Sequence, residues 1–263
     1  MEFKVLKDDE IRQKVSQRYA KVAGGCGSSC GSASGCCSDP MVNPEASEKL
    51  GYGKNELTAV PEGANMGLGC GNPQVLAQLR PGETVLDLGS GGGFDCFLAA
   101  RKVGASGLVI GVDMTPDMIS KARKNAVTGG FENVEFRLGE IEHLPVADNN
   151  VDVIISNCVI NLSPDKKAVF AEAYRVLRKN GRIAVSDVVA LQPMPEQMLQ
   201  NNDAYCGCVA GAVSVEELDR IIEEQGFNEV KIELKPNSAE FIRGWFPGAE
   251  KHVCSASITA VKL

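Results

Sequence analysis

Residues 84–93, TVLDLGSGGG, join a short apolar run to a turn that contains four glycines. The amphipathic stretch FDCFLAARKV follows at 94–103, so the whole segment is typical of a buried strand, a tight turn and a helix. Glycines at 89, 91 and 93 allow positive φ values and a close approach of a ligand to the backbone. A tight turn without a ligand would also fit this spacing. The segment therefore predicts the first strand–turn–helix unit of an α/β fold.

The same alternation continues along the chain. Further runs with strand character lie at 108–113, 134–138, 151–157 and 182–189. Helical patterns separate them, one beginning at Thr115-Pro116 and another running from Ser163-Pro164 to about Arg178. Strands that alternate with helices indicate a parallel sheet covered on both faces. We therefore predict a doubly wound, Rossmann-like α/β sheet.

The segments on either side of this region have other patterns. Apolar residues recur at helical spacing over 8–22, and residues 24–40 form a Gly/Ser-rich stretch with four cysteines. A final helix and strands at 231–234 and 256–263 follow the alternating region. We predict three parts: an N-terminal helix with a Cys-rich arm or lid (1–71), a cofactor-binding domain (72–190), and a small C-terminal α+β cap with substrate-site residues (191–263).

Composition narrows the classes of function. The chain of 263 residues is 44% hydrophobic and 23% charged, as expected for a globular protein with a sizeable core. Its net charge of −7 and 5% aromatic content argue against a nucleic-acid partner. The sequence contains no apolar run of the roughly 20 residues needed to cross a bilayer and no signal-peptide pattern. We therefore expect a cytoplasmic monomer with no membrane partner.

Cysteine is the unusual component of this chain. Ten cysteines occur, at 26, 30, 36, 37, 70, 96, 158, 206, 208 and 254. Cytoplasmic thiols are normally kept reduced, which favours metal, metalloid or redox chemistry over structural bridges. Cys158 follows a predicted strand at the edge of the sheet where ligands bind. Cys70 precedes the first strand, and Cys206 and Cys208 follow the fifth, so all three are candidates for the same edge.

Two acidic residues suggest a nucleoside-containing cofactor. Asp113 ends the second strand about twenty residues after the Gly-rich turn, where a carboxylate can accept both hydroxyls of a ribose. The turn lacks the GxGxxG spacing of nicotinamide dinucleotide enzymes. Glu140, in GEIEHLP after the third strand, is an acceptor for an adenine amino group.

Four motifs together resemble the class I S-adenosylmethionine-dependent methyltransferases over about residues 72–189. They are VLDLGSGGG (85–93), GVDM (111–114), GEIEHLP (139–145) and VDVIISN (151–157). The resemblance implies S-adenosylmethionine as the cofactor, with binding positions at Asp87, Gly89, Gly91, Gly93, Asp113, Met114, Glu140, Ile141 and Asn157. Asp87 and the glycines would lie at its methionine end, Asp113 on the ribose and Glu140 near the adenine. The family more often has Asp at the last position, where this sequence has Glu.

Other segments resemble a narrower family, the arsenite S-adenosylmethionine methyltransferases, over most of the chain. They are GYGKNELTAVPEGANMGLGCGNP (51–73), SNCVINL (156–162), CVAGA (208–212) and the pair of cysteines at 36–37. The resemblance implies that Cys70, Cys158 and Cys208 bind As(III) as thiolates, since soft sulfur ligands select such a centre. The arsenic lone pair would then attack the cofactor methyl group without a catalytic metal.

The resemblance also implies a redox step. Methyl transfer formally leaves As(V), which a thiol pair can reduce by becoming a disulfide. Cys36 or Cys37 occupies the position of the family's additional redox cysteine, and the disulfide would be reduced by thioredoxin or glutathione. The substrate would be arsenite or thiol-conjugated arsenite, in arsenic detoxification. Cys26, Cys30 and Cys206 are possible accessory arsenic-binding thiols.

Other interpretations remain open at this point. The four N-terminal cysteines could form a small zinc site, although their short loops would be cramped. The chain could be a small-molecule S-adenosylmethionine methyltransferase with a Cys-bound metal, or a non-catalytic metalloid-binding protein. Cys96 and Cys254 lie in apolar patterns and are interpreted as core residues.

Overall fold

A seven-stranded sheet forms the centre of the computed structural model, which describes residues 2–24 and 46–263. The strands are β1 Thr84–Leu88, β2 Leu108–Asp113, β3 Val134–Leu138, β4 Val151–Asn157, β5 Leu177–Ala190, β6 Asn228–Lys235 and β7 Val253–Val261. Their order is β3-β2-β1-β4-β5-β7-β6. The first five are parallel, while β7 runs antiparallel to β5 and to β6. The predicted doubly wound α/β fold is confirmed.

The C-terminal strands continue the sheet instead of forming a separate layer. β7 pairs with β5 over its whole length, from Arg182 opposite Val261 to Ala190 opposite Val253. β6 then completes the edge through its own pairing with β7. The strands of the cap predicted at 191–263 are therefore part of the central sheet. The predicted domain boundary at residue 190 stays a prediction.

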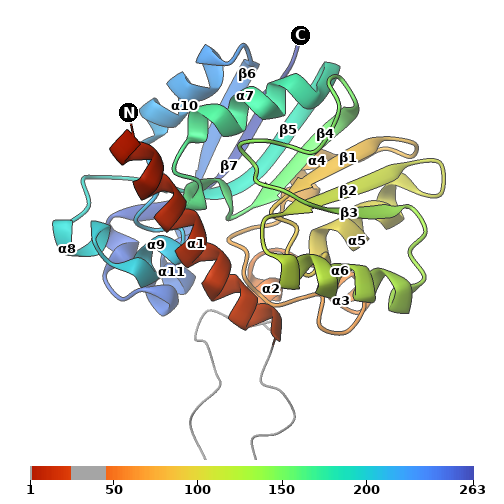
Figure 1. The fold of residues 1–263 in the computed structure, drawn as a ribbon, viewed down its shortest axis with the longest axis horizontal. Coiled ribbons are helices and arrows are strands. Elements are labelled where there is room, and N and C mark those ends of the chain that lie inside the picture. The colour runs from red at the N-terminus through yellow and green to blue at the C-terminus, as the bar shows by residue number, and fades with distance from the viewer. Residues whose placement is uncertain (1, 25–45) are drawn as a thin grey trace, which may run out of the picture.

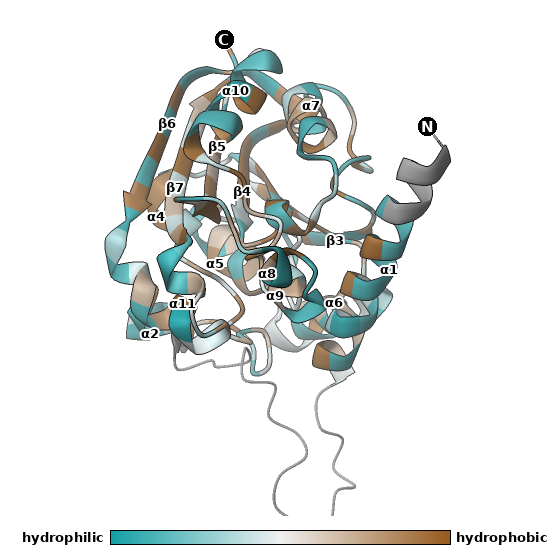
Figure 2. Ribbon diagram, turned by 90° about the vertical axis from the view of Figure 1, so that its left-hand side faces the viewer, coloured by the Kyte–Doolittle hydropathy of each residue, from teal (hydrophilic) through white to brown (hydrophobic). Residues whose placement is uncertain are grey.

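Helices cover both faces of the sheet (Figure 1). The helices are α1 Glu2–Gly24, α2 Ala46–Lys49, α3 Lys54–Leu57, α4 Pro73–Ala77, α5 Phe94–Val103, α6 Pro116–Gly129, α7 Lys166–Val176, α8 Glu196–Leu199, α9 Asn202–Cys206, α10 Val215–Glu224 and α11 Ala239–Trp245, with short 3₁₀ turns at Ile160–Leu162, Pro236–Ser238 and Ala249–Lys251. α7 and α10 bury apolar residues against one face, and α4, α5 and α6 against the other. Figure 2 shows the consequence, since the central strands β4 and β7 are mainly hydrophobic. Burial on both faces explains the continuous apolar runs read from the sequence.

Two predicted helices have other bounds in the structure. The helix predicted to run to about Arg178 ends at Val176, because Leu177 takes extended dihedrals and pairs with Val151 at the start of β5. The N-terminal helix is longer than predicted and runs from Glu2 to Gly24. It packs against α6 and α9, so it crosses the edge of the sheet where the parallel strands end (Figure 1).

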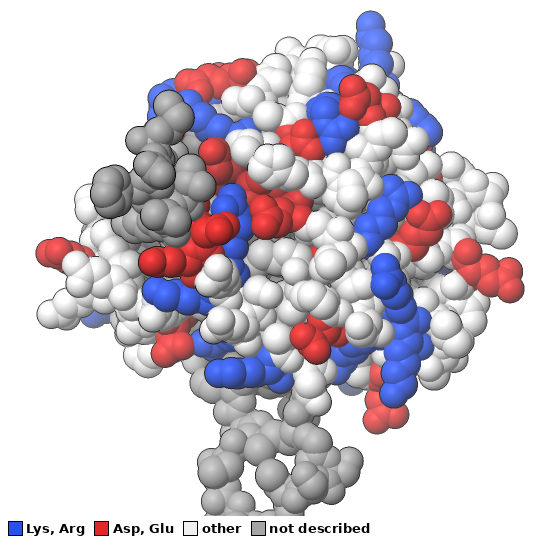
Figure 3. Space-filling model, in the orientation of Figure 1, with Lys and Arg blue, Asp and Glu red and all other residues white. Residues whose placement is uncertain are grey.

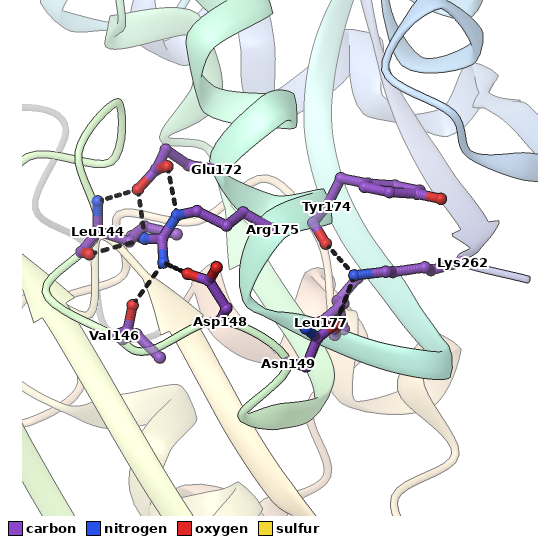
Figure 4. A network of polar contacts seen from close by, with 9 residues as sticks. All are labelled: Leu144, Val146, Asp148, Asn149, Glu172, Tyr174, Arg175, Leu177 and Lys262. Carbon is purple, nitrogen blue, oxygen red and sulfur yellow. Dashed lines mark hydrogen bonds and ion pairs between the residues drawn. The ribbon is translucent and has the colours of Figure 1, made fainter.

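A polar network on α7 anchors the loop after β3 and the end of the chain (Figure 4). The Arg175 guanidinium donates to both carboxylate oxygens of Glu172 at 2.6 and 2.7 Å, and to Asp148 at 2.6 Å. It also donates to the carbonyl oxygens of Leu144 and Val146. Separately, the Lys262 ammonium donates to the carbonyl oxygens of Tyr174 and Leu177, both at 2.7 Å. The loop at 139–150 is therefore held in a fixed position over the sheet edge.

No helix in the described ranges, 2–24 and 46–263, has the length and apolar character of a membrane span.

Candidate active site

A cavity lies at the carboxyl edge of the sheet, where β1, β2 and β4 end. Its empty volume is about 1090 Å³, part of it open to solvent, which is enough for a small-molecule ligand. Most of the predicted cofactor positions line it, namely Asp87, Gly89, Gly91, Asp113, Met114, Ile141 and Asn157. The parallel strands bring these residues together because all of their carboxyl ends meet at one edge.

The Gly-rich turn after β1 brings backbone atoms to the cavity. Gly89, Gly91 and Gly93 have φ values of 68°, 51° and 92°, a region that favours glycine. A side chain at Gly89 would overlap Val159 in the loop after β4. Gly93 does not line the cavity and instead precedes α5 as its N-cap residue. The turn therefore needs glycine for its conformation and for close packing.

Asp113, at the end of β2, is tied to this turn. Its carboxylate accepts the backbone N–H of Gly91 at 2.9 Å and that of Thr115 at 2.8 Å. Burial raises the pKa of Asp113, while these two N–H donors act in the opposite direction. The side chain thus holds two segments of the cavity wall in register, whether or not it also binds a ribose.

The loop after β3 places a different glutamate at the cavity from the predicted one. Glu140 does not line the cavity in the described structure; its side chain is 44% exposed and pairs with Arg12 at 3.4 Å. Glu142 does line it, with its side chain 4% exposed and hydrogen-bonded to Ser163 Oγ at 2.6 Å. Arg12 of α1 also lies 3.4 Å from Glu142. In Figure 3, acidic surface gathers beside α1 in this region. Glu142, and not the predicted Glu140, is therefore the glutamate of this loop that lies at the cavity.

A second acidic cluster lies deeper, around Asp87 and Asp95. Tyr52 donates to the Asp95 carboxylate, with O···O distances of 2.9 and 3.0 Å. Asn157 donates to Tyr52 at 2.9 Å and to Asp95 at 3.3 Å. Burial, and then the charge of Asp95, raises the pKa of Asp87 well above its ordinary value. Burial also raises the pKa of Asp95, opposed by the hydrogen bond from Tyr52.

These features suit S-adenosylmethionine, which carries a sulfonium and an ammonium together with a nucleoside. The buried carboxylates of Asp87 and Glu142 and the partly buried carboxylate of Asp113 line the cavity and complement a cationic ligand. Ser90 Oγ also lies at the cavity, is buried, and has no hydrogen-bond partner in the described part of the chain. A buried hydroxyl without a partner is costly unless a ligand supplies one.

The thiols of Cys70 and Cys158 meet beside this cavity. A carboxylate oxygen of Asp187 and the two sulfur atoms all lie within 4.8 Å of one another, and all three residues are buried. Cys208 reaches the same place, since its thiol donates to the Cys158 carbonyl oxygen at 2.8 Å. Cys158 also lines the cavity itself. The structure thus brings together the three cysteines that the family resemblance singled out.

Glycines on both sides of Cys70 allow its close approach to β4 and β5. A Cβ at Gly69 would lie 2.5 Å from the Asn157 amide nitrogen, and one at Gly71 would overlap Ser186 Oγ. The Cys70 backbone N–H donates to Asn157 Oδ1 at 3.0 Å. The motif GLGCGNP therefore positions a thiol, and Asn157 links the Cys70 backbone to the Asp95 cluster of the cofactor cavity.

Cys158 and Cys208 both take left-handed backbone conformations, with φ values of 59° and 61°. Such values are strained for a residue with a Cβ, and strain of this kind is concentrated at functional sites. The Cys158 N–H donates to the Ser186 carbonyl at 2.8 Å, and Asp187 accepts the N–H of Ile160 at 2.9 Å. Hydrogen bonds from β5 therefore hold the Cys158 turn in place.

Burial sets the protonation of these thiols. It raises the pKa of Cys158 well above the ordinary value, and hydrogen bonds with Cys208 and Cys70 raise it further. The hydrogen bond with Cys158 lowers the pKa of Cys208, but burial and the charge of Asp187 leave it raised overall. These shifts favour the protonated thiols of Cys158 and Cys208, and the exchange of an arsenite hydroxyl for such a thiol releases water with no net change of charge.

The other described cysteines have different surroundings. Cys206, the last residue of α9, is buried, and its carbonyl accepts a hydrogen bond from Tyr19 of α1 at 3.3 Å. Cys254 is buried in β7 next to Ser238, and Cys96 is buried with its thiol 3.2 Å from Asp87. The expected core positions of Cys96 and Cys254 are confirmed. Cys26, Cys30, Cys36 and Cys37 lie outside the described residues.

Several residues of this site escaped the sequence reasoning, namely Arg12, Tyr19, Tyr52, Asp95, Glu142 and Asp187. Asp187 carried a usable signal, because it is a polar residue near the end of the buried run RIAVSDVV. Arg12 and Tyr19 carried none, since only the packing of α1 across the sheet edge brings them to the cavity.

Comparisons with known proteins agree with this geometry. Residues 79–226 match a family model described as a methyltransferase domain. The arsenite methyltransferase of Halobacterium salinarum is 51% identical over 97% of this chain and 67% of its own length. The human arsenite methyltransferase is 34% identical over 84% of this chain, which spans 59% of that protein.

A solved structure is also similar to this chain. The arsenic(III) S-adenosylmethionine methyltransferase from Chlamydomonas reinhardtii is 36% identical, with a TM-score of 0.59, over 73% of this chain and 66% of that one. The chain thus spans between 59% and 67% of these relatives' length. Sheet topology, Gly-rich turn and converging thiols agree with these matches, and the chain belongs to the arsenite methyltransferase family of S-adenosylmethionine-dependent methyltransferases.

Proposed function

We propose that this protein transfers the methyl group of S-adenosylmethionine to trivalent arsenic held by Cys70, Cys158 and Cys208. One observation carries the proposal, namely that three cysteines from three separate loops converge around Cys158, which lines a cofactor-sized cavity. Generic methyltransferase chemistry does not need such a cluster, whereas a soft, three-coordinate centre does. The relatives named as arsenite methyltransferases support the same substrate.

Each part of the site then has a defined task. The carboxylates of Asp87, Asp113 and Glu142 would bind the cationic cofactor, with Asp113 on the ribose and Glu142 near the adenine. Bound S-adenosylmethionine supplies an activated methyl group on a sulfonium. The three cysteines hold arsenic so that its lone pair faces the cavity, and α1 excludes water by covering the edge with Val15 and Tyr19. No general base is required, because the attacking lone pair carries no proton.

The redox part of the proposal concerns thiols outside the described residues. Methylated arsenic, formally As(V), would regain two electrons from a pair of enzyme thiols that becomes a disulfide. Cys36 or Cys37 is the proposed partner, with Cys26 and Cys30 as accessory thiols and thioredoxin or glutathione as the final reductant. The described end of α1, at Gly24, lies next to Lys121 of α6, whose ammonium donates to Ala23 O at 3.3 Å.

The test is direct. Purified protein is incubated with arsenite, S-adenosylmethionine and a dithiol reductant, and the arsenic species are separated by chromatography with mass detection. We expect methylated arsenic, together with protection of three thiols from alkylation by arsenite alone. Bound but unmethylated arsenite, whatever the reductant, would favour the non-catalytic metalloid-binding alternative.

A further inference from the structure

A buried carboxylate lies beside the thiols, and the function proposed above does not use it. Asp187 is 3% exposed, and one of its oxygens lies within 4.8 Å of the sulfur atoms of both Cys70 and Cys158. A charged group is rarely placed in the interior of a protein without a reason, because it loses its solvation there. The question is therefore what this carboxylate does for arsenic.

The hydrogen bonds of Asp187 show that it is held as a fixed anion. Both oxygens already accept N–H groups: Oδ2 from Ile160 and Asn161 at 2.9 and 3.4 Å, and Oδ1 from Asn161 Nδ2 and Val188 at 2.9 and 2.7 Å. N–H donors on both oxygens favour the ionised form. Burial raises the pKa of Asp187 to about 6, and the backbone N–H donors act in the opposite direction. Because both oxygens are engaged, the carboxylate is placed to act through its charge and not as an arsenic ligand.

Methyl transfer moves a positive charge toward this anion. Arsenic bound by three thiolates is neutral and keeps a lone pair. That pair forms the bond to the methyl carbon while the carbon–sulfur bond of the donor breaks, and its electrons return to sulfur. The sulfonium becomes a neutral thioether, and arsenic, formally oxidised to As(V), carries the positive charge.

We propose that Asp187 stabilises the positive charge that develops on arsenic during methyl transfer, an inference that rests on the function proposed above. Asp87, Asp113 and Glu142 line the cofactor cavity, whereas Asp187 does not and lies on the thiol side. The cavity carboxylates therefore stabilise the positive charge while it is on the sulfonium of the cofactor. Asp187 stabilises the positive charge that forms on arsenic. Only the second effect is larger in the transition state than in the ground state and so accelerates the step.

One cation opposes this effect. Lys166, at the start of α7, lies near enough to interact with the charge of Asp187, and its ammonium donates to the Ser163 carbonyl oxygen at 3.4 Å. Burial lowers the pKa of Lys166, and the charge of Asp187 acts in the opposite direction. Removing this ammonium should therefore change the rate in the direction opposite to removing the carboxylate.

The experiment is a single-turnover measurement with enzyme in excess over arsenite. Arsenite bound per chain is measured first, from thiols protected against alkylation, and the rate of methylarsenic formation per bound arsenic is then measured at saturating S-adenosylmethionine. For Asp187→Asn we expect binding within about 3-fold of the wild type and a rate lowered on the order of 10- to 100-fold. Arsenite binding should change little because the complex of As(III) with three thiolates is neutral. The methylation rate should change because a positive charge develops on arsenic during the transfer.

Two matched variants guard against a purely structural explanation. Asn161→Ala removes one hydrogen-bond donor to Asp187 but keeps the charge, so its rate per bound arsenic should stay within about 3-fold of the wild type. Lys166→Gln should raise that rate about 2- to 5-fold, and it does not depend on whether Asp187→Asn folds. An unchanged rate in Asp187→Asn, an equal loss in Asn161→Ala, or a lower rate in Lys166→Gln would each overturn the proposal.

The result for the wild-type protein distinguishes a failure of the proposed function from a failure of the role of Asp187. If wild-type protein binds arsenite but forms no methylarsenic, the proposed function fails and the role of Asp187 fails with it. If the wild type is active and the variants behave alike, only the role of Asp187 is wrong.

Discussion

The cofactor cavity and the thiol cluster share one edge of the sheet, yet they are built differently. Much of the cavity wall comes from short contiguous segments, the turn at 89–92 and residues 113–115. The thiol cluster draws Cys70, Cys158 and Cys208 from three loops that are far apart in the sequence. Within the cavity, local turns set the conformation of each segment before the sheet joins them, whereas each thiol of the cluster depends on long-range packing for its place.

The two regions also treat backbone strain differently. Where the cofactor turn needs positive φ, at Gly89, Gly91 and Gly93, it uses glycine and avoids the strain. The thiol cluster needs the same backbone conformation at Cys158 and Cys208 but cannot use glycine, because it needs the sulfur. Surrounding hydrogen bonds must therefore hold these residues, and we expect substitutions near them to affect arsenic far more than cofactor.

Cys158→Ser should produce the largest effect, a loss of arsenite methylation with little change in cofactor binding. Loss of the thiol in the middle of the cluster should lower arsenite methylation by about 10³-fold or more, because a hydroxyl is a poor ligand for arsenic. S-adenosylmethionine affinity, measured by calorimetry, should change little. Cys254→Ser, at a buried cysteine in β7, is the matched control and should keep its activity. Full activity of Cys158→Ser on arsenite would contradict the proposed thiol set.

Asp113→Ala should have the opposite effect, weakening cofactor binding while arsenite binding is kept. The substitution removes the acceptor for the N–H groups of Gly91 and Thr115, so the cavity wall loses its register as well as its ribose acceptor. We expect S-adenosylmethionine affinity to fall on the order of 10- to 100-fold. Arsenite should still protect three thiols from alkylation to the same extent as in the wild type. A parallel loss of arsenite binding would show that the two regions are not separable.

Gly211→Ala tests the packing between the two strained loops. A Cβ at Gly211 would overlap the Asn161 carbonyl oxygen, so the loop that carries Cys208 must move away from the loop that carries Cys158. We expect arsenite affinity to fall by about 10-fold, with S-adenosylmethionine affinity within about 2-fold of the wild type. Gly244→Ala, where no atom lies within 4 Å of the added Cβ, is the control. Equal effects of the two substitutions would argue against this packing role.

The smallest predicted effect is a loss of stability when the Glu172–Arg175 pair, which holds the loop after β3, is removed (Figure 4). The size of this loss should depend on pH. The hydrogen bond from Arg175 lowers the pKa of Glu172, so this carboxylate contributes stability above its ordinary pKa and loses it as the pH falls through the lowered value. Glu172→Gln should be less stable than the wild type by about 0.5–1 kcal/mol at pH 7, a value that allows for partial solvent screening. The difference in denaturant unfolding should shrink toward pH 3. A gap that stays constant with pH would contradict this origin.

Much of the fold could be predicted because its signals are local. The parallel strands from β1 to β4 end within a residue or two of their apolar runs, since each run is buried on both faces. The start of β5 was missed because Leu177 continues an apolar helical pattern, and only its pairing with Val151 decides that it is extended. The joining of β6 and β7 to the main sheet also depends on long-range pairing, which no local pattern encodes.

By itself, the sequence determined that the chain is an α/β protein with a glycine turn and acidic residues at strand ends, and that Cys70, Cys158 and Cys208 lie in segments that such a fold can bring to one edge. Strand periodicity and turn chemistry are properties of neighbouring residues, so they are readable in order along the chain. Tertiary structure alone decided that Glu142 faces the cavity while Glu140 pairs with Arg12, and that Asp187 lies against the thiols. These outcomes depend on distances between segments separated by tens of residues, which packing sets and sequence spacing does not.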